Sequence, residues 1–226
     1  MLILFDVDGT LFDEAAAERA GALELHRRAA SAMTFPNFLT AWSAATERHF
    51  DRYLRGETDF RGQRRARIRE VINPDLDDEA ADATFDAYRR AYESAWSLFP
   101  DVAGCLDALA GQQLGVVTNG EGSEQRRKLA KTGAADRFDC IVVSGECGYV
   151  KPSTEIFLHA CELLGVSPSD AVYVGDRYDV DAQAARRAGL MGVWLDRGGT
   201  RTAVHRGPVI GTLAELAGSL DRARPA

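Results

Sequence analysis

The sequence predicts an α/β fold, a doubly wound parallel sheet with an α-helical domain inserted into it. From residue 102 onward, short apolar segments alternate with helical ones, which is typical of βαβ units in a parallel sheet. Between the first strand and the second lie about 90 residues, far more than the dozen or so that a crossover needs. After the first strand, we expect strands at residues 114–118, 140–144, 171–175, 192–195 and 208–210.

The first strand, at residues 2–5, is apolar throughout and runs directly into Asp6 and Asp8. An unbroken apolar run is typical of a strand buried on both faces of a sheet. Because successive strand residues alternate in direction, Asp6 and Asp8 should point to the same side. Open α/β sheets bind ligands at the carboxyl ends of their strands, and paired acids there suit Mg²⁺, which commonly bridges carboxylates to a phosphate.

The long connection predicts a helical domain at residues 14–97, with residues 1–13 and 98–226 forming the sheet domain. Apolar side chains recur at helical spacing in it, for example at Phe38, Trp42 and Ala45. A second helical stripe follows residue 151, in the sheet domain. We expect its members to face the core: Ile156, Phe157, Ala160, Leu163 and Leu164.

Composition limits the classes of partner. The 226 residues carry a formal net charge of −7, which argues against a nucleic-acid binder, because such proteins need a basic surface. No segment approaches the roughly 20 apolar residues of a membrane helix, and the amino terminus reaches an acid by residue 6 without a cleavage site. The four cysteines show no metal-binding spacing, and we expect them to be buried or incidental thiols. We therefore expect a soluble cytoplasmic protein.

Four short motifs follow one another along the chain, three of them at the ends of expected strands. They are Asp-Val-Asp-Gly-Thr-Leu at residues 6–11, Thr118-Asn119-Gly120, Lys151-Pro152, and Gly175-Asp176 followed by Asp181. In this order they resemble the motifs of the haloacid dehalogenase-like hydrolase superfamily, most of whose members are phosphatases with an aspartate nucleophile. The resemblance covers essentially the whole chain, although residues 14–97 match only in length and helical character. It implies a Rossmann-like core with residues 14–97 as the cap domain.

The resemblance also implies catalytic roles. Asp6 would be the nucleophile that forms an aspartyl-phosphate, and Asp8 the general acid that protonates the leaving oxygen and then activates water. Because a free aspartate titrates near about 3.9, the pKa of Asp8 should be raised by burial or by Asp6. The Thr118 hydroxyl and the Asn119 backbone amide would bind the phosphate, and Lys151 would supply positive charge.

A metal site is implied by the same motifs. The Asp6 carboxylate, the Asp8 backbone carbonyl and Asp176 would hold Mg²⁺. Asp181 matches the family's second acid at this point and would orient Lys151, the metal's water molecules or the metal itself. Asp179 is off this pattern and reads as an acid favoured by the dipole of a helix amino terminus.

These observations favour a Mg²⁺-dependent phosphatase acting on a small phosphorylated metabolite, with the cap selecting the substrate. A phosphomutase would share every core residue and differ in how the cap binds a bisphosphate intermediate. A dehalogenase is disfavoured, since that branch needs no leaving-group acid at the position of Asp8. A phosphorylatable switch or other non-catalytic binding protein is the alternative from another class, but a receiver domain needs no large insert. We expect no nucleic-acid or membrane partner, and a monomer or homodimer.

Overall fold

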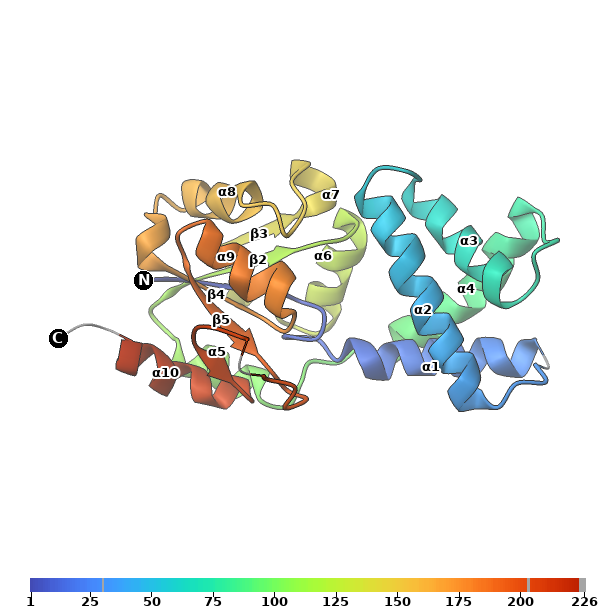
Figure 1. Ribbon diagram of the computed structural model, residues 1–226, viewed down its shortest axis with the longest axis horizontal. Helices are drawn as coiled ribbons and strands as arrows, with labels where there is room; N and C mark the ends of the chain where they lie inside the picture. The colour runs from blue at the N-terminus through green and yellow to red at the C-terminus, as the bar shows by residue number, and fades with distance from the viewer. Residues whose placement is uncertain (30, 203, 224–226) are drawn as a thin grey trace. The chain divides into compact units, whose positions relative to one another are not determined.

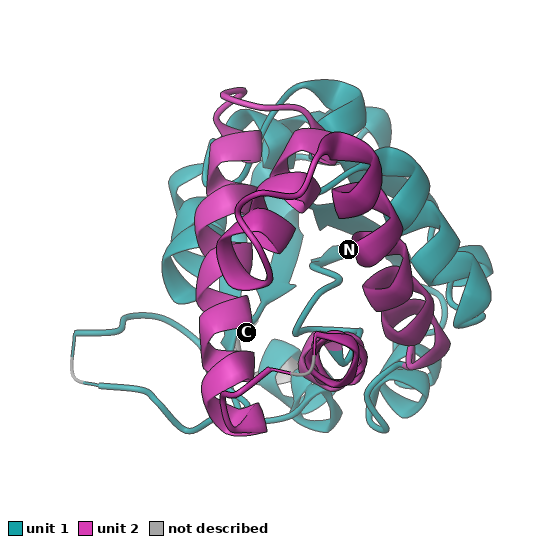
Figure 2. Cartoon of the chain, turned by 90° about the vertical axis from the view of Figure 1, so that its right-hand side faces the viewer, with its two compact units in different colours: residues 1–13, 98–226 teal, residues 14–97 magenta. Residues whose placement is uncertain are grey.

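The computed structural model describes residues 1–29, 31–202 and 204–223. The chain divides into two compact units, one formed by Met1–Asp13 and Leu98–Ala226, the other by Glu14–Ser97 (Figure 2). None of the helices in the described ranges is long and apolar enough to cross a lipid bilayer.

Unit 1 is built on a six-stranded sheet in which every neighbouring pair of strands is parallel. The strand order is β3-β2-β1-β4-β5-β6. Its strands are β1 (Leu2–Phe5), β2 (Gln113–Thr118), β3 (Cys140–Val143), β4 (Ala171–Gly175), β5 (Met191–Leu195) and β6 (Val209–Ile210). The predicted α/β class with a parallel sheet is confirmed.

Strand β1 lies in the middle of this sheet because its side chains leave no polar face. All four residues are fully buried. β1 pairs with β2 on one side and β4 on the other, with Phe5 opposite both Val116 and Val174. The chain runs outward from β1 to β2 and β3, then returns to β4 on the other side, so the strand order reverses at β1. Ligands of open α/β sheets bind at such a reversal, beyond the carboxyl ends of the strands.

Helices lie on both faces of the sheet (Figure 1). The helices of unit 1 are α5 (Val102–Ala108), α6 (Gly122–Lys131), α7 (Ser144–Cys147), α8 (Glu155–Leu163), α9 (Gln183–Arg187) and α10 (Leu216–Ala223). Short turns add η1 (Ala135–Arg137), η2 (Pro168–Asp170), the π-helical turn η3 (Tyr178–Ala182) and η4 (Leu213–Glu215). Helices α8 and α9 share one apolar cluster with inward-facing residues of β1 and β4.

The apolar stripe of α8 is as expected except at one position. Ile156, Phe157 and Ala160 are fully buried, and Leu164 packs against the same cluster. Leu163, by contrast, is 57% exposed, so its prediction as a core residue is wrong. The reason is geometric, because Cys161 and Leu164 continue the buried stripe and leave Leu163 on its flank.

All four cysteines are free thiols, and Cys105 and Cys161 are buried. The two buried thiols pack as small apolar groups, as expected for cysteines with no metal-binding spacing.

Unit 2 is α-helical, with α1 (Glu14–Arg28), α2 (Phe35–Leu54), α3 (Phe60–Val71) and α4 (Asp78–Ser94). Aromatic side chains fill its interior. Trp42 of α2 is fully buried, with its ring centroid 4.7 Å from that of Tyr88 and 6.5 Å from that of Phe85, both on α4. The expected stripe of α2 is therefore the buried face of this unit.

Arg197, which follows β5, binds both segments of unit 1 at which the chain passes to and from unit 2. Its guanidinium donates to both carboxylate oxygens of Asp101, at 2.8 and 3.0 Å, and to the Thr10 carbonyl at 2.9 Å. The guanidinium also lies 3.9 Å from the centre of the Phe99 ring. The Phe99 amide in turn donates to the Leu11 carbonyl at 2.9 Å. One side chain thus ties the outgoing and the returning segment together.

Replacing Arg197 with Met should lower the free energy of unfolding by about 2 kcal/mol, since it removes charged hydrogen bonds at a site only 22% exposed. The matched control is Arg137→Met, which removes a more exposed ion pair with Asp107 and should cost about 0.5 kcal/mol. Urea denaturation of both variants measures the difference. Equal losses would show that Arg197 contributes no more than a surface ion pair.

Candidate active site

Asp6 follows β1 directly, and its backbone continues the sheet pairing by donating from its amide to the Val174 carbonyl at 2.9 Å. Its carboxyl group is 8% exposed. It therefore lies at the carboxyl end of a central strand, as the sequence predicts, and at the point where the strand order reverses. A carboxylate so deeply buried needs a compensating charge.

The Lys151 ammonium supplies that charge and makes three buried contacts. It donates to Asp6 Oδ1 at 2.7 Å, to Asp181 Oδ1 at 2.8 Å and to the Tyr173 hydroxyl at 2.8 Å. Burial alone would lower the pKa of Lys151, but the carboxylates of Asp181 and Asp6 outweigh burial and raise it. Lys151 is thus a fixed positive charge beside Asp6, and it is oriented by Asp181 as one of the predicted options requires.

The loop that carries Lys151 is held by the side chain of Asn119. Asn119 Oδ1 accepts from the Lys151 amide at 2.9 Å, and Asn119 Nδ2 donates to the Lys151 carbonyl at 3.0 Å. The Lys151-Pro152 peptide bond is cis. We expected only the backbone amide of Asn119 to act, so this structural role of its side chain was missed. The backbone role stays a prediction.

Two glycines make room for the acids that follow β4. Gly9 has a φ of +78°, and a Cβ atom there would lie 2.4 Å from Asp176 Oδ2. A Cβ atom on Gly175 would lie 2.4 Å from Cγ of Asp181. The motifs at residues 6–11 and 175–176 therefore need glycine so that these two carboxyl groups can approach β1 and β4 closely.

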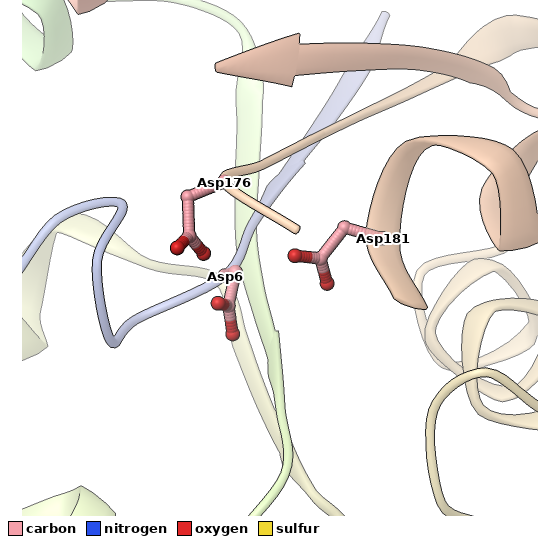
Figure 3. A group of neighbouring side chains, drawn as sticks. All are labelled: Asp6, Asp176 and Asp181. Carbon is pink, nitrogen blue, oxygen red and sulfur yellow. The ribbon is translucent and has the colours of Figure 1, made fainter. Parts of the chain in front are cut away.

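Asp6, Asp176 and Asp181 form one acidic group (Figure 3), in which a carboxylate oxygen from each lies within 4.8 Å of the others. Burial, reinforced by Asp181, raises the pKa of Asp176 to about 6. Burial also raises the pKa of Asp6, against the lowering influence of Lys151. Asp176 Oδ1 is buried and accepts no hydrogen bond from any residue that the structure describes. An unpaired oxygen among crowded acids fits a hard divalent cation, which prefers oxygen ligands.

The carboxyl group of Asp8 is not part of this acidic group. Its Oδ2 accepts from Gln125 Nε2 at 2.8 Å, and its Oδ1 contacts Lys128 Nζ at 2.5 Å. Both partners lie on α6 and were missed by the sequence analysis. Their spacing of three residues on one helix face was the available signal. The Asp8 carbonyl as a metal ligand stays a prediction.

Thr118 ends β2 and is 1% exposed, with its hydroxyl 3.3 Å from the Asn119 carbonyl. That distance leaves only a weak hydrogen bond, so the hydroxyl can turn to another acceptor. Tyr173 of β4 was also missed. Its hydroxyl bonds to the Val117 carbonyl at 2.9 Å as well as to Lys151. A tyrosine in an otherwise aliphatic buried strand needs such a partner, and this was the signal to find it.

Asp179 is exposed and lies in the first turn of η3, consistent with its expected place at the start of a helical segment. It takes no part in the acidic group of Asp6, Asp176 and Asp181.

Comparison with known proteins agrees with these motifs. The sequence matches the haloacid dehalogenase-like hydrolase family over residues 1–189. It is 35% identical over 202 residues to the glyceraldehyde 3-phosphate phosphatase of Methanopyrus kandleri, covering 87% of this chain and 84% of that protein. It is 31% identical over 205 residues to the N-acylneuraminate-9-phosphatase of Rattus norvegicus, covering 87% and 83% of the two chains.

A similar solved structure is that of the HAD-hydrolase YfnB from Bacillus subtilis, determined with bound magnesium. The TM-score is 0.80 and the sequence identity 24%, with 97% of this chain and 98% of that chain covered. At that identity the likeness concerns the fold.

The raised pKa of Asp176 should make the metal-free protein's stability depend on pH. A folded-state pKa of about 6, above the ordinary 3.8, gives a stabilising contribution that is full below about pH 4 and lost as the pH rises through 6. In chelator, the melting temperature of the wild type minus that of Asp176→Asn should therefore fall by about 4 °C between pH 4.5 and 7.5. The Asn variant cannot ionise, so the difference contains the titration of Asp176 and its effect on Asp6, while titrations elsewhere in the protein cancel. A constant difference would contradict the burial effect.

Proposed function

The chain belongs to the haloacid dehalogenase-like hydrolase family and is a phosphoric monoester hydrolase, and we propose that it cleaves a small phosphorylated metabolite with Mg²⁺ through an aspartyl-phosphate. The observation that carries the proposal is the position of Asp6, whose carboxylate lies beside the Lys151 ammonium and in the acidic group with Asp176 and Asp181. We propose that residues 14–97 are the cap that selects the substrate.

Phosphoryl transfer needs an in-line nucleophile, positive charge near the equatorial oxygens and a proton for the leaving oxygen. Asp6 is proposed as the nucleophile, held by Lys151 so that one carboxylate oxygen is left to attack. Lys151 offsets the negative charge of the transferring group, assisted by the Thr118 hydroxyl and the Asn119 amide. When bound by Asp6, Asp176, the Asp8 carbonyl and, directly or through water, Asp181, Mg²⁺ would supply charge neutralisation.

Asp8 is proposed as the leaving-group acid. Its carboxyl group, 31% exposed, is the least buried of the catalytic acids in this interpretation, so it can reach a leaving oxygen and later a water molecule. A dehalogenase would have no use for a proton donor there. A phosphomutase would use the same residues, and no contact within the described residues favours it.

The substrate is best identified by phosphate release over a panel that includes the substrates named by the relatives. Glyceraldehyde 3-phosphate and N-acylneuraminate 9-phosphate should be tested beside other sugar phosphates, nucleotides and phosphoglycolate. A preferred substrate, hydrolysed with steady release of phosphate, supports the proposal. Phosphorylation of the protein without turnover on any ester would point instead to the non-catalytic alternative.

Asp6→Asn should lower kcat by more than about 1,000-fold, because it removes the nucleophile at nearly constant volume. The exposed Asp107→Asn is the matched control and should leave phosphate release unchanged. Circular dichroism checks that both variants fold. An Asp6→Asn enzyme that retains a tenth of wild-type activity would contradict the mechanism.

Chelation should stop phosphate release, and added Mg²⁺ should restore it, if the acidic group of Asp6, Asp176 and Asp181 holds the cofactor. The assay is repeated after exhaustive dialysis against chelator. Full activity without any divalent cation would rule out the proposed cofactor while leaving the nucleophile open.

Asp8→Ala should harm poor leaving groups most, since general acid catalysis typically contributes about 10²- to 10⁴-fold. We expect a loss in kcat in that range with an alkyl phosphate and a much smaller one with 4-nitrophenyl phosphate. Steady-state kinetics on the two esters gives the comparison. Equal losses would mean that Asp8 supports the site only structurally.

A further inference from the structure

Two polar side chains on the buried face of α6 have no role in the proposed chemistry so far. Gln125 is 4% exposed and Lys128 is 1% exposed, at positions where a helix packed on a sheet ordinarily carries apolar residues. The Lys128 ammonium lies over the face of the Phe12 ring, with Nζ 4.5 Å from the ring centre.

Both side chains converge on Asp8. Lys128 Nζ lies 2.5 Å from Asp8 Oδ1, and Gln125 Nε2 lies 2.8 Å from Asp8 Oδ2. Gln125 Nε2 is also 3.3 Å from the Asn119 carbonyl, so the same amide connects Asp8 to the loop after β2. Each oxygen of the Asp8 carboxyl group therefore has its own donor on α6, which fixes the plane of that group.

Packing alone does not account for this arrangement. Removing an ammonium from water costs several kcal/mol, and a leucine of similar volume would fill the space without that cost. The Asp8 side chain is 31% exposed and the Lys128 side chain 2% exposed. The lysine therefore loses most of its contact with water in this pair, whereas the acid keeps part of its own. Such an arrangement is expected where the orientation of the Asp8 carboxyl group matters more than the free energy of folding that burial of the ammonium costs.

We propose that Lys128 and Gln125 are positioning residues for Asp8, which hold its carboxyl group in the orientation needed to protonate the leaving oxygen. A carboxyl group offers about four lone-pair sites, so two donors leave room for its own proton, through which the group donates to the leaving oxygen. As an Asp6 carboxylate oxygen bonds to phosphorus and the bond between phosphorus and the leaving oxygen breaks, the electron pair stays on the leaving oxygen, and the proton moves to it from Asp8. The Asp8 carboxylate that remains keeps its contact with the Lys128 ammonium.

The inference rests on the proposed role of Asp8 and is tested by its dependence on the leaving group. In Lys128→Met, kcat should fall about 10- to 100-fold with an alkyl phosphate, because a misplacement of about 1 Å can cost about 10²-fold. With 4-nitrophenyl phosphate the fall should be less than about 3-fold, since a good leaving group needs little general acid catalysis. Lys131→Met, an exposed position on the same helix, is the matched control and should behave as the wild type.

A double-mutant cycle separates positioning from a general effect on the fold. Once Asp8 is Ala, Lys128→Met should have little further effect, because the group that it positions is gone. If the loss from Lys128→Met is equal for both esters, or persists in full in the Asp8→Ala background, the proposal is overturned. Gln125→Met removes the donor to Asp8 Oδ2 at similar side-chain size, and its kcat should also fall mainly with the alkyl phosphate. This variant replaces Lys128→Met in the test if Lys128→Met does not fold.

Failure of the proposed function would look different. If Asp8 is not the leaving-group acid, Asp8→Ala itself shows no preference between the two esters. If Asp8→Ala lowers kcat mainly with the alkyl phosphate while Lys128→Met and Gln125→Met affect both esters equally, Asp8 is the leaving-group acid but Lys128 and Gln125 do not position it.

Discussion

The ammonium group of Lys151 is the contact on which the rest of the site depends. It joins Asp6 at the end of β1, Tyr173 within β4 and Asp181 in the turn η3, all of them buried. Losing one partner of a buried ion pair commonly costs about 3–5 kcal/mol, because a charge is left without compensation. Loss of the Lys151 ammonium would leave two neighbouring buried carboxylates, those of Asp6 and Asp181, without a compensating charge. The Asn119 side chain bonds to the backbone of Lys151 and so holds the residue from which the ammonium extends. Asn119 therefore supports this contact together with the acids.

The fold could be predicted because its signals are local. Each apolar strand is short and bounded by turn residues, and the expected limits lie within one residue of the observed ones. The acids could be located for the same reason, since Asp6 and Asp176 directly follow strands that a parallel sheet brings side by side. The contact of Asp181 with Lys151 followed from family resemblance rather than from periodicity.

The missed residues depend on contacts between distant segments. The spacing of Gln125 and Lys128 places both on one face of α6, but it does not indicate that their partner will be an acid 120 residues before Lys128. The tyrosine in β4 signals that its hydroxyl needs a partner, but the sequence does not indicate that the partners are Val117 and Lys151. Leu163 fits the helical stripe by its spacing, yet Cys161 and Leu164 occupy the buried face instead. Spacing identifies which residues share a face, but tertiary packing decides how wide the buried part of that face is.

The central place of β1 has a consequence for how the chain is made. β1 is synthesised well before its neighbours β2 and β4, which end at Thr118 and Gly175. At about 5–20 residues per second, the interval before β4 is complete is on the order of 10 s or more. Until β2 is made, after all of Glu14–Ser97, the four wholly apolar residues of β1 have no strand to pair with, and the side of β1 that pairs with β4 stays open for longer still. The nascent chain therefore exposes one edge of β1 until β4 is complete, and a chaperone that binds apolar segments would find its target at residues 2–5.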